Sequence, residues 1–153
     1  MIRRLILLTS VLAASALAQQ TLGDISGMYS FLQEGEFVQV TVEDGGRVTG
    51  FISRFGDLPS DKGAFLDQFF KKASLDGNKL TFTTEPVHGV WYEFRGTVDR
   101  GEGKTPADEA YYVLKGKLTQ HVTDATQKTS SRSRQVLLKS FPQDTFSNTE
   151  KRN

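Results

Sequence analysis

Apolar and polar residues alternate from Gly27 onward, in short segments separated by glycine-rich turns. A period of two is typical of half-buried antiparallel strands. The segment 36–43, for example, would place three valines on one face and Gln39 and Thr41 on the other. The turn Asp44-Gly45-Gly46 then predicts a hairpin, because glycine tolerates the positive φ of tight turns. This alternation leaves little room for any fold class other than all-β.

The pattern predicts about eight strands with short connections. The clearest of them span residues 27–32, 36–43, 47–55, 79–84, 87–99, 111–122 and 134–141, and a short piece near 73–75 is a further candidate. This number of strands and this length of chain fit an antiparallel up-and-down β-barrel. No linker divides the chain, so residues 25–142 are expected to form one β-barrel domain. A polar lead (19–24) precedes it and a flexible tail (143–153) follows it.

Three predicted strands contain a glycine in phase with their apolar face: Gly50, Gly96 and Gly116. A glycine weakens a strand unless the sheet bends there or another backbone comes close. We therefore expect the sheet to coil sharply at these positions, which favours closure into a small barrel. The alternative is that the three glycines are unrelated, in a chain that contains 14 of them.

One segment, residues 61–72, predicts a short amphipathic helix. Phe65, Leu66, Phe69 and Phe70 would share one helical face, Asp61 would supply capping chemistry, and two lysines would lie near the C-terminal end. Such a helix would plug one end of the barrel, cover its mouth or clamp an apolar ligand.

The first residues have the pattern of a secretory signal peptide. Arg3 and Arg4 precede an uncharged and mostly apolar run over residues 5–17, and Ala16-Leu17-Ala18 matches the small-x-small pattern of signal peptidase sites. The run is shorter than the roughly 20 residues of a membrane-spanning helix. We expect residues 1–18 to be removed by cleavage between Ala18 and Gln19. The mature protein would then be secreted or periplasmic, without a stable membrane anchor.

Composition excludes several function classes. The chain contains no cysteine, so disulfide scaffolds, thiolate metal sites and cysteine nucleophiles are excluded. Without Arg3 and Arg4 the chain keeps 17 of its 19 basic residues against 18 acidic ones, and a net charge near zero argues against nucleic acid as a partner.

Catalytic and metal-binding motifs are weak or incomplete. His88 and His121 have no ligand-forming partner at a local spacing, and no serine lies in a Gly-x-Ser-x-Gly motif. The segment 101–105 resembles the end of a phosphate-binding loop, but Val98 occupies the position of its first glycine. We therefore predict no cofactor, no metal and no catalytic residue. A cross-strand carboxylate pair drawn from Glu34, Glu36, Glu85 and Glu93 is left open as an enzymatic alternative.

The segment Gly27-Met28-Tyr29, the turn at 44–46 and Val48-Thr49-Gly50 resemble the opening of the avidin and lipocalin superfamily, the calycin-type barrels. The resemblance implies a barrel. It does not imply biotin binding, because Phe31 and Ile52 stand where avidins place polar biotin contacts and Trp91 is the only tryptophan. The whole chain is also similar to small secreted bacterial proteins.

These observations together favour a non-enzymatic barrel that binds a small apolar or aromatic ligand, or a short peptide. Aromatic side chains would supply the contact area. The predicted ligand-binding residues are Tyr29, Phe65, Phe69, Phe70, Phe82, Tyr92, Phe94 and Tyr112. The alternative is a solid-core barrel that acts as a structural or protein-interaction module of the cell envelope, with Trp91 and Tyr111 as surface contacts. The sequence leaves the oligomeric state open.

Overall fold

The computed structural model describes residues 23–143, and this part of the chain is all-β. The predicted signal peptide (1–18), its cleavage site at Ala18–Gln19, most of the polar lead and residues 144–153 lie outside the described residues. Eight antiparallel strands follow one another: β1 (Gly27–Ser30), β2 (Phe37–Val42), β3 (Val48–Phe55), β4 (Phe65–Asp76), β5 (Lys79–Thr84), β6 (Val90–Arg100), β7 (Tyr112–Thr123) and β8 (Thr129–Lys139).

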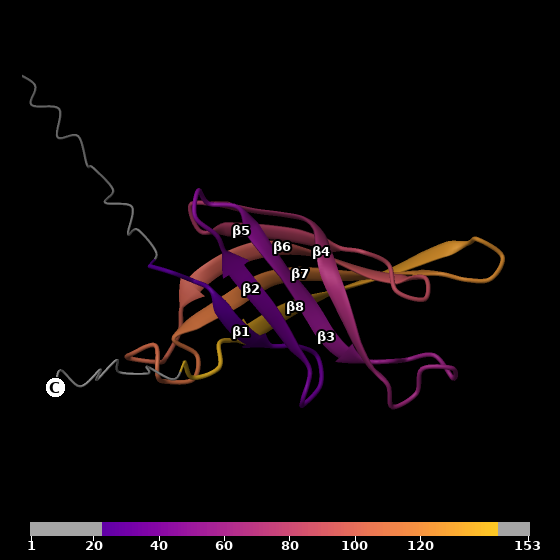
Figure 1. Cartoon of the computed structure of the whole chain (residues 1–153), viewed down its shortest axis with the longest axis horizontal. Coiled ribbons are helices and arrows are strands. Elements are labelled where there is room, and N and C mark those ends of the chain that lie inside the picture. Colours follow the sequence, from indigo (N-terminus) through magenta and orange to yellow (C-terminus); the bar gives the residue numbers. More distant parts are fainter. Residues whose placement is uncertain (1–22, 144–153) are drawn as a thin grey trace, which may run out of the picture.

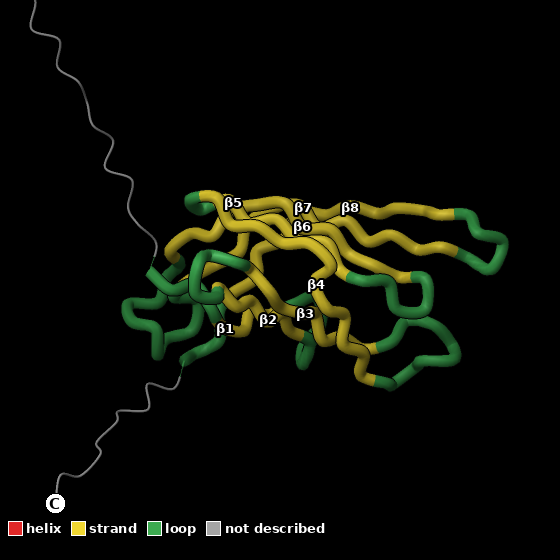
Figure 2. The backbone as a smooth tube through the Cα atoms, turned by 45° about the horizontal axis from the view of Figure 1, so that its top comes forward, coloured by secondary structure: helices red, strands yellow, loops and turns green. Residues whose placement is uncertain are grey.

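Each strand pairs with the next strand of the chain, so the sheet is a simple meander in the order β1 to β8. The sheet curls into a half-barrel, and the β7–β8 hairpin extends beyond the other strands (Figures 1 and 2). At one end the two edges of the sheet meet. Tyr29 of β1 forms an antiparallel bridge with Ser140, and the Phe141 N–H donates to the Met28 carbonyl at 2.8 Å.

The predicted amphipathic helix over residues 61–72 is wrong, because most of this segment is the first part of β4. Phe65 and Phe69 point outward, while Gln68 and Phe70 point inward, which is the alternation of a strand. Phe65, Leu66, Phe69 and Phe70 fit one helical face, but the same spacing also fits a strand with large apolar residues on both faces. The strand forms because β4 pairs its backbone with both β3 and β5, which a helix at this position could not do.

A bulge divides β4 into two halves. Phe65 to Phe69 pair with β3, Phe70 and the residues from Lys72 onward pair with β5, and the register shifts between Phe70 and Lys72. A bulge increases the local bend and twist of a strand. β4 therefore turns the sheet from its first half (β1–β3) to its second half (β5–β8), and the concave face between the halves contains the core.

Side chains from the concave face fill the core. Phe70, Phe82 and Phe94 form a stack, with ring centroids 4.3 and 5.2 Å apart. Fully buried around them are Tyr29, Val38, Val40, Ile52, Leu80, Tyr92, Leu114 and Leu118.

Gly96 of β6 faces Gly116 of β7, and the two strands approach closely there. A Cβ on Gly116 would lie 2.4 Å from the Arg95 carbonyl oxygen and 2.5 Å from the Gly96 Cα. A Cβ on Gly96 would lie 2.7 Å from the Phe94 ring. Only glycine fits at this close approach, and the coiling expected from the glycines is present in the curled sheet.

Candidate functional site

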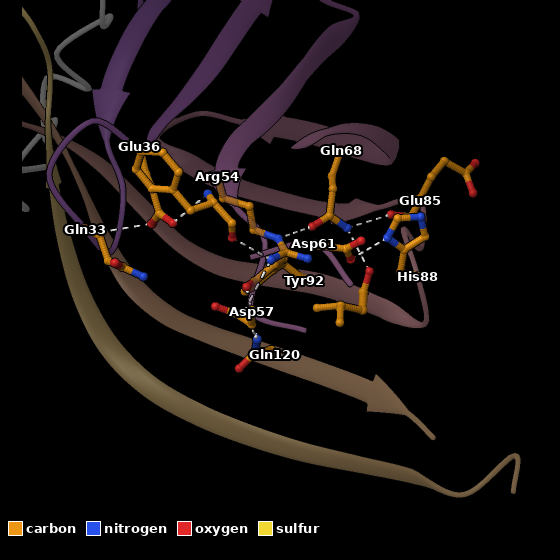
Figure 3. A network of polar contacts seen from close by, with 12 residues as sticks. Gln33, Glu36, Arg54, Asp57, Asp61, Gln68, Glu85, His88, Tyr92 and Gln120 are labelled. Atoms are coloured by element: carbon orange, nitrogen blue, oxygen red, sulfur yellow. Dashed lines mark hydrogen bonds and ion pairs between the residues drawn. The ribbon is translucent and has the colours of Figure 1, made fainter. Parts of the chain in front are cut away.

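A polar network occupies one end of the concave face, where the β1–β2, β3–β4 and β5–β6 connections gather (Figure 3). Its centre is Arg54, which is only 2% exposed and lies in phase with the apolar residues of β3. The Arg54 Nε donates to Gln68 Oε1 at 2.5 Å, and its Nη1 donates to the Phe55 carbonyl at 3.0 Å. The neighbouring Gln68, fully buried on β4, donates to the carbonyls of Glu85 and Val90.

Arg54 also contacts Asp57 and Tyr92 at this end of the concave face, which we call the mouth of the half-barrel. Its Nη1 lies 3.4 Å from Asp57 Oδ2, and its guanidinium carbon lies 5.5 Å from the centre of the Tyr92 ring. Gln120 on β7 donates to the Tyr92 hydroxyl at 3.1 Å and lies 3.5 Å from Asp57. The Asp57 side chain remains half exposed, so it can accept further hydrogen bonds from solvent or a ligand.

Burial raises the pKa of Tyr92, and the nearby Arg54 cation opposes this shift only in part. The phenol is therefore neutral at physiological pH. Because Gln120 donates to its oxygen, the phenolic hydrogen is available as a donor toward the mouth.

Glu36 is the second buried charge of this region, at 3% exposure. One carboxylate oxygen accepts the Gln33 N–H at 3.0 Å and the other accepts the Phe55 N–H at 3.0 Å. The carboxylate therefore ties the β1–β2 turn to the end of β3. Two backbone donors compensate part of the cost of burying it.

These groups surround a pocket of about 370 Å³ at the mouth of the half-barrel. This volume lies within the range of small-molecule sites, roughly 300–1,000 Å³. The pocket wall combines two carboxylates, a phenol, two amides and a guanidinium. The lining residues are Leu32, Gln33, Glu36, Asp57, Tyr92, Gln120 and Arg134.

The loop that supplies Asp57 is fixed from its other side. His88 Nδ1 lies 2.5 Å from Asp61 Oδ2, which links the β3–β4 connection to the β5–β6 turn. The loop also closes on itself, because Gly56 donates to the Ala64 carbonyl and bridges to Lys62. Asp57 is thus held by an ordered loop and not by a long free segment.

The structure separates the predicted ligand-binding residues into three groups. Tyr29, Phe82, Tyr92, Phe94 and Tyr112 are buried in the core. Phe70 is half-buried and stacks on Phe82, whereas Phe65 and Phe69 lie on the outer face at 48% and 60% exposure. Of all eight residues only Tyr92 lines the mouth pocket.

The predicted surface residues Trp91 and Tyr111 are both half-buried. Trp91 stacks on His121 across β6 and β7, with ring centroids 4.9 Å apart. The Arg100 guanidinium carbon lies 3.6 Å from the centre of the Tyr111 ring, and Tyr111 packs against the core.

Among the site residues that sequence reasoning missed are Arg54, Asp57, Gln120 and Arg134. A signal for Arg54 was present: it continues the inward series of Val48, Gly50 and Ile52, so a charged residue stands where an apolar one is expected. A charge in the apolar phase must be paired, and such pairs mark sites more often than surface charges do. The other three residues could be found only through pairing between distant strands and loops.

No protein-family model matches the chain, and no curated protein sequence matches it. Within residues 23–143 there is no helix long and apolar enough to cross a membrane. The same described part contains no group of three or more His, Asp or Glu side chains arranged to hold a metal ion.

Proposed function

We propose that this protein is exported and binds a small zwitterionic molecule, or the end of a short peptide, in the mouth pocket without converting it chemically. In this proposal the half-barrel is an up-and-down barrel that is open between β1 and β8. The observation that supports it best is the Arg54–Gln68 network, because burying such polar groups is costly and a fully hydrogen-bonded network holds the side chains around it in one arrangement.

The pocket offers separate places for opposite charges. The half-exposed Asp57 carboxylate would accept an ammonium group, with Gln33 and Gln120 as neutral neighbours. Arg134, which also lines the pocket, would hold a carboxylate. The neutral Tyr92 hydroxyl would orient the molecule between them. A carboxylate and a guanidinium facing one small space favour a zwitterion over a purely apolar ligand.

The core position of most predicted aromatic residues supports a ligand at the mouth and not inside the barrel. Tyr29, Phe82 and Phe94 pack against other side chains and are at most 2% exposed. The apolar or aromatic ligand expected from the sequence stays a prediction. The polar character of the mouth makes a charged small molecule the better-supported candidate.

A titration with free amino acids, betaines and dipeptides tests the proposal. We expect at least one of them to raise the melting temperature and to shift the NMR signals of Gln33, Tyr92 and Gln120, since a ligand bound only by the folded state stabilises it. Asp57→Asn should abolish the effect. Asp44→Asn, in the exposed β2–β3 turn, is the matched control. Equal responses of both variants would reject the pocket.

A second candidate function is the protein-interaction module, and one feature of the outer face favours it. Five phenylalanines from β2, β3 and β4 cluster there, with neighbouring ring centroids 5.0 to 6.4 Å apart: Phe37, Phe51, Phe55, Phe65 and Phe69. Contiguous exposed apolar surface marks contact sites more often than single exposed residues do. Phe69→Ser with Phe65→Ser should then weaken a partner contact without changing the mouth pocket.

A further inference from the structure

β8 is an edge strand over most of its length. It pairs with β7 from Thr129 to Lys139. The other side of β8 faces β1, which has only four residues. Described residues of β1 contact only the C-terminal end of β8. Tyr29 bridges to Ser140, and the Lys139 N–H donates to the Ser30 hydroxyl at 3.0 Å. A stretch of β8 from 129 to 137 is therefore without a strand neighbour in the described part of the chain. Edges of this kind are templates for pairing with another chain.

The hydrogen-bond alternation of an antiparallel pair identifies which backbone groups face this open edge. The Ser140 N–H donates to Tyr112 of β7, whereas the Lys139 N–H points away from β7 to Ser30. Counting back in steps of two from Lys139 gives the residues whose N–H and C=O point to the open edge. These are Ser131, Ser133, Gln135 and Leu137.

The intervening residues on the concave side give this edge a positive charge. Arg132 and Arg134 lie opposite Gln120 and Leu118 of β7, so both occupy the face that continues into the mouth. Both are exposed, and in the described part of the chain neither forms an ion pair. Two cations at i and i+2 on one face of a strand match two carboxylates at the same spacing on a neighbouring strand.

A second copy of this chain meets like charges in the two registers that centre on the arginine pair. Antiparallel pairing of β8 with itself around Ser133 would place Arg132 of each copy opposite Arg134 of the other. Pairing around Arg134 would place the two Arg134 side chains opposite each other. Like charges directly opposite one another destabilise a strand pair. The charge pattern therefore favours an acidic partner.

We propose that the open edge of β8 binds an extended acidic segment of a partner protein as an added strand. Its backbone would pair with Ser131, Ser133, Gln135 and Leu137, and carboxylates at every second residue would pair with Arg132 and Arg134. Addition of a strand to an exposed edge is a common mode of peptide recognition, with affinity from the main chain and specificity from alternate side chains. This inference goes beyond the mouth pocket, and the two sites share only Arg134.

The probe is a synthetic peptide in which glutamate alternates with threonine and valine, compared with the same peptide containing lysine in place of glutamate. The acidic peptide should bind at least about tenfold more tightly than the basic one, and more weakly at high salt. It should also slow the amide hydrogen exchange of Ser133, Gln135 and Leu137. Equal binding of both peptides, or unchanged exchange at these amides, would overturn the proposal.

Two variants separate backbone pairing from charge. Gln135→Pro removes one N–H of the open edge and no bond to β7, since proline is tolerated at an edge whose N–H faces solvent. It should reduce peptide affinity about tenfold or more, and Gln135→Ala should not. The double variant Arg132→Glu with Arg134→Glu reverses the charge of two exposed side chains, so we expect the protein to stay folded. This variant should bind the basic peptide more tightly than the acidic one. A preference that does not change would reject charge recognition.

The two proposals fail separately. Asp57→Asn is expected to abolish small-molecule binding and to leave the acidic peptide bound at wild-type affinity. Gln135→Pro is expected to do the reverse. A dimer that forms through β8 and excludes the peptide, detected as a doubled mass in sedimentation, would show that a second copy is the occupant and would overturn the inference.

Discussion

At the scale of single residues, the buried Arg54 guanidinium is the group on which the mouth depends most. Its removal leaves the Gln68 side-chain oxygen and the Phe55 carbonyl without this donor. We expect Arg54→Met to lower the free energy of unfolding by about 2–4 kcal/mol, because buried polar partners are left unsatisfied. Urea denaturation measures the change.

The matched control is Arg47→Met. Arg47 pairs with Glu43 on the surface, with 74% of its side chain exposed. Surface ion pairs contribute little, so this variant should change stability by less than about 1 kcal/mol. An Arg54 variant as stable as the Arg47 variant would contradict the structural role of the network.

The buried tyrosines Tyr29 and Tyr92 contribute to an alkaline limit of stability. Burial raises the pKa of Tyr29 and of Tyr92, and the Tyr29 hydroxyl also donates to the Ile25 carbonyl at 2.6 Å. In the unfolded chain each tyrosine loses its proton near pH 10, while the folded protein keeps it. The stabilisation is therefore complete below about pH 10 and falls between that pH and the raised pKa of each folded-state tyrosine, by at most about 1.4 kcal/mol per pH unit for each.

Urea unfolding at a series of pH values measures this fall. Tyr29→Phe removes one titrating group, so its stability should be lower at neutral pH, from the lost hydrogen bond, and should fall less steeply in alkali than that of the wild type. Parallel curves for the two proteins would show that Tyr29 titrates normally in the fold.

At the scale of elements, the contact between β6 and β7 depends on the absence of two side chains. Gly116→Ala would place a methyl group within 2.5 Å of the Gly96 Cα, so the strands must separate or slide. We expect a loss of about 1–3 kcal/mol in unfolding free energy, the usual cost of overpacking. Lys117→Ala, on the exposed face of the same strand, should have a small effect. A stable Gly116→Ala variant would mean that the curl can relax.

The strands themselves were largely predictable from sequence. Alternation and turn residues located β2, β3, β5, β6 and β7 to within about three residues, since these signals are local. The second part of β8 was predicted too, but its start at Thr129 was missed because residues 129–135 are polar on both faces. For the first part of β4 the sequence predicts a helix, because its apolar pattern fits both structures; the piece near 73–75, in the second part of β4, is a correctly predicted strand candidate.

The mouth site was much less predictable than the strands. Tyr92 was named, but only as one of several aromatic residues. Arg54 and Gln68 meet across 14 residues, and Gln120 reaches Asp57 across 63. Such pairs depend on the register and curvature of the sheet, which no local pattern specifies.

At the scale of the whole molecule, the bend at β4 sets both the core and the mouth. The first half of the sheet contributes Glu36, Arg54 and the loop with Asp57, and the second half contributes Tyr92, Gln120 and Arg134. The two edges of the sheet meet through Tyr29 and Ser140, while the opposite end of β8 has no described strand beside it. Side chains fill the core at the end where the two edges meet, so no space is left for a ligand there. Charged side chains line the other end, and the proposed ligand therefore lies at the mouth.

Native mass spectrometry tests the central proposal most directly. The mature protein is purified gently from its producing cells and is then incubated with the panel of amino acids, betaines and dipeptides. The account predicts an added mass that leaves on activation, that matches a small molecule with an ammonium and a carboxylate, and that Asp57→Asn does not retain. A bare chain throughout, or the same added mass on Asp57→Asn, would contradict a zwitterion site at the mouth.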